Sequence, residues 1–363
     1  MIMKKIVPIF VIFLFSLISV QGQKTAEFAE KIRTENNIPE LSYAVVTDKS
    51  VLEIAALGQH SVDLKDKASL KDRFHIGSNT KAMTGFVIAK YVEAGKLKWD
   101  TKFFDLFPEW KIDSKSEYYG ITLQDLLSHR AKVQPFQGEE ENVPQFKGTK
   151  QLKREALGKY VLTLPVVETD ETANFIYSNS GYTLAALMLE KATGKTWEQL
   201  IIEVFNKDLK LNVKFSFPEN QKKKDTWGHQ TNDDKLIPIP SNKAPQLDYT
   251  EPAGDLNLRI TDYIKFIQLN LQGLSGKDNY LKAETYKFIH KGIEDYSIGW
   301  YNIYEKDQEF STHSGTVETY FANVSIDRKK NIGYIIFTNS FNQKTTNGVR
   351  MLMRKLKETY GNS

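Results

Sequence analysis

The chain has 363 residues, of which 40% are hydrophobic and 12% aromatic, enough to bury a large core, so we expect one large domain or two interlocked ones. Its 49 basic and 45 acidic residues give a formal net charge of only +4 and are spread along the sequence, which argues against nucleic acid as a partner. The absence of cysteine excludes disulfides, thiolate metal sites and cysteine nucleophiles.

The first 22 residues are typical of a secretory signal peptide. Two lysines precede an apolar stretch at 6–20, and Gly22 supplies a small residue that is followed by polar sequence. An uncleaved membrane anchor is the alternative, but about 15 apolar residues are short for a span that needs ~20. We therefore predict a signal peptide at 1–22, no stable membrane anchor after its cleavage, and an exported protein that is periplasmic or secreted.

The next segments predict a helix and two strands. Phe28 and Ile32 have helical spacing, and Pro39 ends the helix. Two β-rich runs follow at 41–47 and 51–58, and the Asp-Lys-Ser between them favours a hairpin. The front of the chain is thus expected to be a surface helix and a strand pair.

The middle of the chain is mostly helical by its pattern. Apolar residues recur with helical spacing in six segments: 80–94, 122–128, 151–160, 181–193, 196–206 and 261–271. Long polar stretches at 137–148 and 219–235 interrupt these segments and are expected to be solvated loops.

The end of the chain returns to strands. Three β-rich runs lie near 309–316, 319–326 and 332–338, and a helix is expected over 345–360. Two strands at the start and three at the end predict one antiparallel sheet assembled from both termini.

The predicted fold class is therefore α/β in the broad sense, or α+β. A five-stranded antiparallel sheet is flanked by helices and carries a large, mostly helical insertion. We expect a sheet domain made of 23–77 and 276–363, a helical domain at 78–275, and an active site at their interface.

Ser78 and Lys81 stand three residues apart just before a long apolar run. In a helix such residues share a face, so the hydroxyl and the amine can come within hydrogen-bonding distance. The run is apolar nearly all round, which predicts a buried helix, and burial would lower the pKa of Lys81 towards that of a usable base. Ser78 at the helix N-terminus would gain stabilisation of developing negative charge. Ser-x-x-Lys alone, however, also occurs by chance.

Two further motifs strengthen this prediction. Tyr177 and Asn179 form a short polar turn directly before another apolar helix, which Gly194 ends. His313, Ser314 and Gly315 interrupt a predicted strand with small residues. Glycine inside a strand often marks the close approach of a ligand or of another backbone segment.

Together the three motifs resemble the active-site triplet of the serine β-lactamase and penicillin-binding protein superfamily, Ser-x-x-Lys, Tyr-x-Asn and Lys/His-Ser/Thr-Gly. Their order and spacing agree with that family. The Tyr-x-Asn form resembles the class C β-lactamase branch, which also contains DD-peptidases, esterases and D-amino-acid peptidases. The resemblance extends to four more segments: 95–110, 121–129, 251–267 and the Tyr-x-x-Gly-Trp stretch at 296–301.

The resemblance implies a role for each motif residue. Ser78 is the nucleophile that forms an acyl-enzyme, and Lys81 takes its proton or holds the network that does so. Tyr177 matches the phenol that transfers a proton to the leaving group, and its pKa of about 10 would have to fall for it to act as a base. Asn179 would hydrogen-bond Lys81 and the substrate amide.

The third motif is expected to bind the reacting carbonyl and the substrate. The backbone N–H groups of Ser78 and Thr316 would form the oxyanion hole, and Ser314 and Gly315 would contact substrate. His313 stands where lactamases usually carry lysine and where many peptidases and esterases of this group carry histidine. An imidazole is charged only near or below its reference pKa of about 6.5, which weakens its attraction for a β-lactam carboxylate at neutral pH.

Other histidines and cations near the motifs have simpler interpretations. His75 and His129 are expected to be structural. Arg130 and Lys132 replace a Thr-Ser-Gly-Leu type of turn usual in the family, and they either bind an acidic substrate group or are solvated. No His-Glu-x-x-His motif, paired His/Asp cluster or glycine-rich phosphate loop is present, so we expect no metal and no cofactor.

The sequence thus predicts an exported serine hydrolase that cleaves an ester or amide. The expected partner is a small-molecule or peptide substrate: in descending order, a D-amino-acid peptide of peptidoglycan type, a small ester, or a β-lactam. A true class C-type β-lactamase is one alternative. A non-catalytic sensor that binds penicillin or peptidoglycan is another, although all four catalytic side chains are present.

Overall fold

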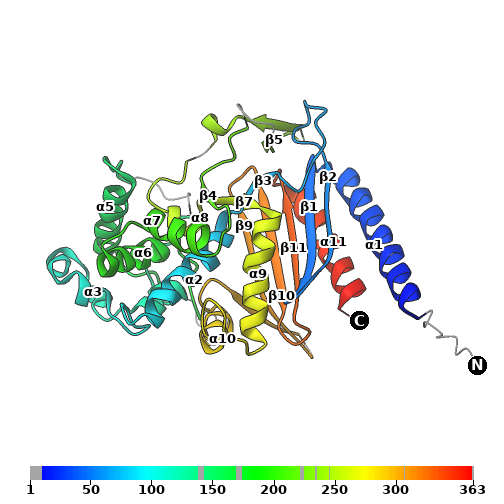
Figure 1. Ribbon diagram of the computed structural model, residues 1–363. Coiled ribbons are helices and arrows are strands. Elements are labelled where there is room, and N and C mark those ends of the chain that lie inside the picture. The colour runs from blue at the N-terminus through cyan, green and yellow to red at the C-terminus, as the bar shows by residue number, and fades with distance from the viewer. Residues whose placement is uncertain are drawn as a thin grey trace, which may run out of the picture.

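Strands from the two ends of the chain form one antiparallel sheet (Figure 1). The computed structural model describes residues 10–137, 143–168, 174–220, 225–233, 235–244, 246–305 and 307–361. The strand order is β2-β1-β11-β10-β9-β8, with bounds Val51–Gly58, Glu40–Thr47, Ile332–Thr338, Phe321–Asp327, Gln308–Thr316 and Tyr301–Glu305. The predicted assembly of the sheet from both termini is confirmed.

The sheet has six strands, where the sequence predicts five. The additional strand, β8, pairs with β9 at the edge of the sheet, with Tyr301 opposite Thr312. Its last three residues are exposed, so it lacks the alternation of apolar and polar residues that marks a half-buried strand. An edge strand of this kind has little pattern by which the sequence could reveal it.

Helices cover both faces of the sheet (Figure 1). Side chains on one face of β1, such as Tyr43, pack with Val349 and Leu352 of α11 (Gln343–Tyr360). The same layer contains α1 (Phe10–Glu35), which contacts α11. On the other face, α9 (Ile260–Leu274) packs across β1 and β11.

The expected domain boundaries remain predictions. Helix α9 lies before the predicted boundary at 275, yet its side chains Gln268 and Gln272 donate hydrogen bonds to the carbonyl oxygens of Thr47 and Asp48, at 3.1 Å and 3.0 Å. This helix therefore belongs to the layers around the sheet by its contacts.

The helical region is built around α2 (Thr80–Glu93), which lies between the sheet and the other helices (Figure 1). Every residue from Thr80 to Ala89 is buried, as the apolar run predicts. The other helices of this region are α3 (Phe103–Leu106), α4 (Leu123–Leu127), α5 (Lys150–Thr163), α6 (Asn179–Thr193), α7 (Trp197–Ile201), α8 (Glu251–Gly254) and α10 (Ala283–Lys291), with a π-helical stretch at Ile202–Asp208 and 3-10 turns at Gly77–Asn79, Pro108–Asp113, Ser116–Tyr118 and Ser241–Lys243.

Two small sheets complete the fold. One contains β3 (Arg73–His75), β7 (Leu256–Arg259) and β4 (Lys214–Phe215). The other is a hairpin of β5 (Gly228–Asn232) and β6 (Lys235–Ile239), and β5 lies in a segment for which the sequence predicts only a polar loop. The polar composition of β5 conceals it, and β6 is short, contains a proline and stays largely accessible to solvent.

The predicted signal peptide falls partly outside the described residues, because residues 1–9 are not among them. In the described part of the chain, none of the helices combines the length and the apolar character needed to cross a membrane. The leader at 1–22 stays a prediction from sequence.

Candidate active site

The turn that carries Ser78 is pressed against strand β9. Gly77 has a φ of +49°, which favours glycine, and a Cβ atom placed on it would lie 2.4 Å from the backbone N of Thr316. A Cβ atom on Gly315 would likewise lie 2.5 Å from the backbone N of Ser78. Glycine on both sides therefore lets the two backbone segments approach each other at the proposed oxyanion hole.

Lys81 lies directly beneath Ser78 and is fully buried. Its Nζ is 3.1 Å from Ser78 Oγ, 2.7 Å from Asn179 Oδ1 and 3.0 Å from the carbonyl oxygen of Ala253. No carboxylate of the described residues is among its hydrogen-bond partners, and burial lowers the pKa of Lys81 well below its usual value. A neutral amine can donate its two N–H bonds to Asn179 and Ala253, which leaves its lone pair for the Ser78 hydroxyl proton.

Tyr177 and Asn179 reach the same point from the start of α6. Lys81 Nζ lies 4.6 Å from the centre of the Tyr177 ring, and Asn179 Nδ2 donates to the Phe136 carbonyl at 2.8 Å. Burial raises the pKa of Tyr177 well above its usual value, although an interaction with the Ser78 hydroxyl opposes the rise. Tyr177 could act as a base only if its pKa were lowered. Its pKa is raised instead, so the phenol stays protonated.

His129 supports Tyr177 from behind. The backbone N–H of Ser178 donates to His129 Nδ1 at 3.1 Å, and the imidazole and Tyr177 rings have centres 4.4 Å apart. Burial holds the pKa of His129 well below its usual value. His129 is thus a neutral structural residue, and His75 likewise binds backbone, accepting the N–H of Gly77 at 3.1 Å.

His313 is neutral as well. Its Nδ1 lies 2.8 Å from the Ser314 carbonyl oxygen, so Nδ1 carries the proton and Nε2 accepts a hydrogen bond from the Tyr296 hydroxyl at 3.0 Å. Burial lowers the pKa of His313 to about 3. The imidazole is therefore uncharged over a wider range than its reference pKa suggests.

Two cavities meet at Ser78 and form one cleft. The larger, of about 520 Å³, has an aromatic wall and is lined by Ser78, Gln137, Tyr177, Tyr301, Thr312, His313, Ser314, Gly315, Thr316, Phe321 and Phe341. The smaller, of about 330 Å³, lies on the side of α8 and is lined by Ser78, Gln137, Asn179, Gln246, Leu247, Thr250, Ala253, Gly254, Thr316, Val317 and Glu318. Seven of the eight predicted site residues line this cleft, and Lys81 lies beneath it.

The described residues that line the cleft do not include Arg130 or Lys132. The Arg130 guanidinium donates to the carbonyl oxygens of Ser128, Tyr296 and Glu294, at 3.0 Å, 2.9 Å and 2.6 Å. Arg130 therefore fixes the loop before β8, a structural role that differs from both roles considered from sequence.

Three contributors to the site are missed by sequence reasoning about single residues. The Ala253 carbonyl is the third partner of Lys81, Tyr296 fixes His313, and Gln137 lines both parts of the cleft. Ala253 and Tyr296 belong to segments that resemble the family, and this resemblance was the one sign in the sequence that could have pointed to them. Gln137 had no such signal.

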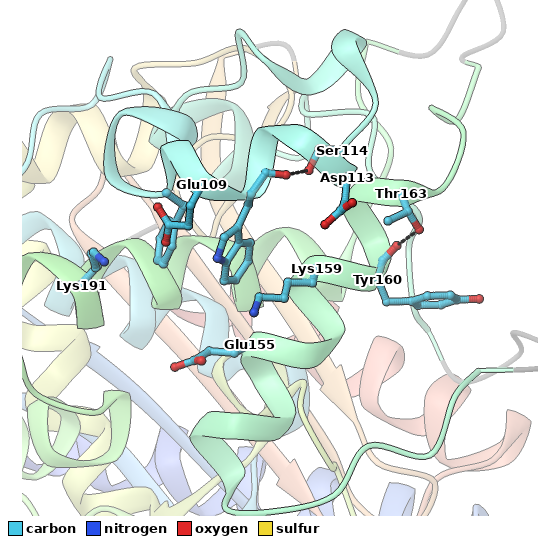
Figure 2. Close-up of a pocket in the computed structure, with 10 residues that line it drawn as sticks. Glu109, Asp113, Ser114, Glu155, Lys159, Tyr160, Thr163 and Lys191 are labelled. Atoms are coloured by element: carbon cyan, nitrogen blue, oxygen red, sulfur yellow. Dashed lines mark hydrogen bonds between the residues drawn. The ribbon is translucent and has the colours of Figure 1, made fainter.

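A larger cavity, of about 870 Å³, lies away from Ser78 and contains none of the predicted site residues. Figure 2 shows Glu109, Glu155, Lys159 and Lys191 around it. The Nζ of Lys159 lies 5.1 Å from the ring centre of the largely buried Trp110, and the acidic and basic groups around it are mixed. Its size alone gives it no chemistry comparable to that of the cleft.

The described residues contain no group of three or more His, Cys, Asp or Glu side chains that could hold a metal ion. The reacting groups at Ser78 are instead an amine, a phenol, an amide and backbone N–H groups. Such a set suits acyl transfer to the serine.

Curated proteins with similar sequences include "Protein flp" of Staphylococcus aureus strain N315. It is 24% identical over 327 residues, which cover 87% of this chain and 63% of that protein. "Penicillin-binding protein 4" of Amycolatopsis lactamdurans is 23% identical over 192 residues, or 52% of this chain and 48% of that protein. The chain thus spans less than two thirds of the length of these relatives.

Solved structures share the fold. The octameric penicillin-binding protein homologue from Pyrococcus abyssi has a TM-score of 0.71 at 21% identity, covering 88% of this chain and 73% of that one. The D-amino acid amidase from Ochrobactrum anthropi SV3 has a TM-score of 0.73 at 16% identity, covering 93% and 99%. The family model described as Beta-lactamase matches residues 25–356, and we conclude that the chain belongs to the beta-lactamase family.

Proposed function

We propose that the protein is a serine hydrolase that cleaves an ester or amide through an acyl-Ser78 intermediate. One observation carries the proposal: the buried Lys81 amine has two neutral acceptors, Asn179 and the Ala253 carbonyl, and lies 3.1 Å from Ser78 Oγ. A desolvated amine without an acidic partner is a base, and a serine within its reach is an activated nucleophile.

In acylation, Ser78 Oγ bonds to the carbonyl carbon of the substrate while its proton passes to Lys81 Nζ. The oxygen of the tetrahedral intermediate accepts hydrogen bonds from the backbone N–H groups of Ser78 and Thr316. The bond to the leaving group then breaks, and Tyr177 passes a proton to the leaving nitrogen or oxygen as it receives one from Lys81. The balance is an acyl-serine ester and a free amine or alcohol.

In deacylation, water is the acceptor. A water molecule attacks the acyl-serine carbonyl, its proton passes to the Lys81 amine, directly or through Tyr177, and the Ser78 oxygen leaves with a proton. The product is a carboxylic acid, and the enzyme regains its starting state.

The electrostatics of the cleft favour esters and amides over β-lactams. His313 is neutral, with its pKa near 3, and no lysine or arginine is among the described residues that line the cleft. A β-lactam carboxylate would thus lack a cationic partner there. The structural likeness to a D-amino acid amidase supports an amide of a D-amino acid as a substrate class. The apolar leader in the sequence supports export to the periplasm or medium.

A sensor that binds its ligand without turnover is the second candidate, favoured by the similarity to proteins whose names describe penicillin binding. The two candidates differ in the fate of the acyl-enzyme. A sensor would hold an acyl group on Ser78 for hours, whereas a hydrolase would release it.

The test is intact-mass spectrometry of the protein with a fluorophosphonate, a penicillin and p-nitrophenyl acetate, together with turnover of p-nitrophenyl acetate and D-phenylalanine p-nitroanilide. We expect a fluorophosphonate adduct on Ser78 and steady release of nitrophenol and nitroaniline. The Ser78→Ala variant should be folded and should give neither. Turnover that survives in Ser78→Ala would refute the nucleophile assignment, and a stable acyl adduct without turnover would favour the sensor.

A further inference from the structure

The cleft has an uneven distribution of charge. Among the described residues that line it, Glu318 is the one acidic residue, no lysine or arginine is present, and His313 is neutral. Glu318 belongs to the smaller cavity, which also contains Ser78, Thr316 and Val317. An acidic residue therefore lines the same cavity as the nucleophile.

The backbone holds Glu318 in a fixed turn. It has a φ of +61°, and the next residue, Thr319, closes a tight turn by donating its N–H to the Val317 carbonyl at 2.7 Å. The hairpin strand β5 anchors this turn, because the N–H of His229 donates to the Thr319 carbonyl at 3.1 Å. Gln230 of the same strand donates to Glu318 Oε2 at 3.2 Å.

The carboxylate keeps further capacity to accept hydrogen bonds. A carboxylate has about four lone-pair positions, and Gln230 uses one at Oε2. The side chain is exposed, so a ligand in the cavity can reach it. The amide contact also fixes its direction without neutralising its charge.

The opposite side of the cleft is aromatic. Tyr177, Tyr301, Phe321 and Phe341 line the larger cavity, and the Tyr177 and Tyr301 rings are stacked with centres 6.3 Å apart. A surface of this kind suits an apolar or aromatic group. The two sides of Ser78 thus differ in chemistry.

We propose that the cleft selects a substrate with a protonated amine, which Glu318 recognises, and an apolar side chain, which the aromatic wall holds. An aminoacyl amide or ester with a free α-ammonium group has both features. This inference rests on the proposed function and names its substrate class, with Glu318 as a specificity-determining residue. A substrate whose free carboxylate must lie near Glu318 is disfavoured by like charge.

The kinetic test compares D-phenylalanine p-nitroanilide with its N-acetyl derivative, which lacks the charge but keeps the ring and the scissile amide. We expect the wild-type protein to prefer the free amine in kcat/KM. In Glu318→Gln, which keeps an acceptor for Gln230, the ratio of the two kcat/KM values should fall by about three- to fivefold, as expected for a solvent-accessible ion pair. Added salt should lower the wild-type ratio and leave the variant ratio nearly constant.

The matched control is Glu305→Gln, which changes the net charge equally at an exposed position on β8. Its ratio should equal that of the wild type. An unchanged ratio in Glu318→Gln, or an equal fall in Glu305→Gln, would overturn the inference, since the carboxylate would then serve only to hold the turn or act through net charge.

A binding test separates this inference from the proposed function. The Ser78→Ala protein is titrated with D-phenylalanine amide and with its N-acetyl derivative, which requires no turnover. Tighter binding of the free amine, lost in Ser78→Ala/Glu318→Gln, supports Glu318 even if no acyl-enzyme forms. Acylation of Ser78 by p-nitrophenyl acetate without any preference for the amine would leave the hydrolase intact and refute the role of Glu318.

Discussion

Two buried basic side chains lie in the helical half of the molecule, and their surroundings are opposite. Lys81 has two neutral oxygen acceptors and the Ser78 hydroxyl. Arg154 faces three carboxylates: Glu190 and Glu198, both at 2.7 Å, and Glu251 at 3.4 Å. Both side chains are fully shielded from solvent, so the difference between them lies in their partners.

The partners decide the protonation states. Burial lowers the pKa of Lys81, whereas for Arg154 the effect of burial is exceeded by its carboxylate partners, which raise its pKa. Burial in turn raises the pKa of Glu251 to about 7, even though Arg154 and Lys150 oppose the rise. The Lys81 amine is therefore suited to accept a proton, whereas the paired Arg154 guanidinium links α5, α6, α7 and α8.

The largest expected effect follows from removing the uncompensated amine. Lys81→Met should lower kcat/KM for p-nitrophenyl acetate by about 10³-fold, because Ser78 loses its base. The free energy of unfolding should change by only about 1 kcal/mol, since the variant removes a desolvated group along with its hydrogen bonds. Kinetic assays and urea unfolding measure the two effects.

Lys90→Met on the same helix is the control, because Lys90 packs over the Tyr280 ring, with its Nζ 4.1 Å from the ring centre, away from the cleft. It should retain activity. Near-normal turnover in Lys81→Met would mean that another group is the base.

Arg154→Met should have the reverse profile. The buried Glu190 and Glu251 and the partly exposed Glu198 would lose their shared partner, so the free energy of unfolding should fall by about 3–5 kcal/mol. Urea unfolding measures this loss, and the exposed Arg350→Met is the matched control, with an expected change within about 0.5 kcal/mol. Adding Glu251→Gln to Arg154→Met should restore part of the stability. No loss in the single variant would mean that the carboxylates are already protonated in the native protein.

Tyr177→Phe tests whether the phenol beside the amine works as a proton relay. Turnover should fall by about 10²-fold while the fold is kept. Because burial raises the pKa of Tyr177, the ultraviolet difference spectrum between the wild type and this variant should contain no phenolate band at pH 9. A phenolate band at that pH would show that Tyr177 is a base in the free enzyme. The exposed Tyr304→Phe should have normal turnover.

The smallest expected effect concerns His290, a buried histidine outside the cleft, and the pH dependence of stability. Its Nε2 lies 2.9 Å from Asn270 Oδ1, its ring is stacked on Trp300, and burial holds its pKa well below the usual value. Below about pH 6.5 His290 binds a proton in the unfolded chain but not in the native protein, so the free energy of unfolding falls as the pH falls. His290→Gln should remove about 1.4 kcal/mol per pH unit from this slope between pH 6 and 5.

Urea unfolding at several pH values measures this slope. His60→Gln should change it in the opposite direction, because a hydrogen bond to Asp72 raises the pKa of His60 despite its burial. Protonation of His60 therefore stabilises the native protein as the pH falls, and His60→Gln removes this stabilisation. Equal slopes in the wild type and His290→Gln would mean that His290 is protonated in the native protein.

Patterns within short segments allowed most of the fold and the centre of the site to be predicted. The spacing of Ser78 and Lys81 placed both on one face, and the apolar run placed Lys81 in a buried helix; the structure has both features. Such patterns could not reveal β8 or the β5–β6 hairpin, whose residues are largely accessible to solvent.

Contacts between distant segments were the least predictable. The Ala253 carbonyl meets Lys81 from 172 residues away, and the Tyr296 hydroxyl, from the loop before β8, is the partner of His313 Nε2. The direction of the pKa shift of Tyr177 also depends on the rings and helices around it, so the reference pKa could not predict the shift. Substrate selection by Glu318 likewise depends on a turn that β5 anchors.

The pairing of β1 with β11 has a consequence for the order in which the molecule gains activity. Leu41 lies opposite Thr338 in this pair, and β10 and β9, which carries Thr316, follow β11 in the sheet. Contacts between residues so far apart in the sequence form slowly, because a long loop must close first. Ser78 and Lys81 can come together within one turn of a helix, but Thr316, the proposed second oxyanion donor, reaches them only when the late strands dock. A nascent chain would therefore hold its nucleophile and base long before it could stabilise a tetrahedral intermediate.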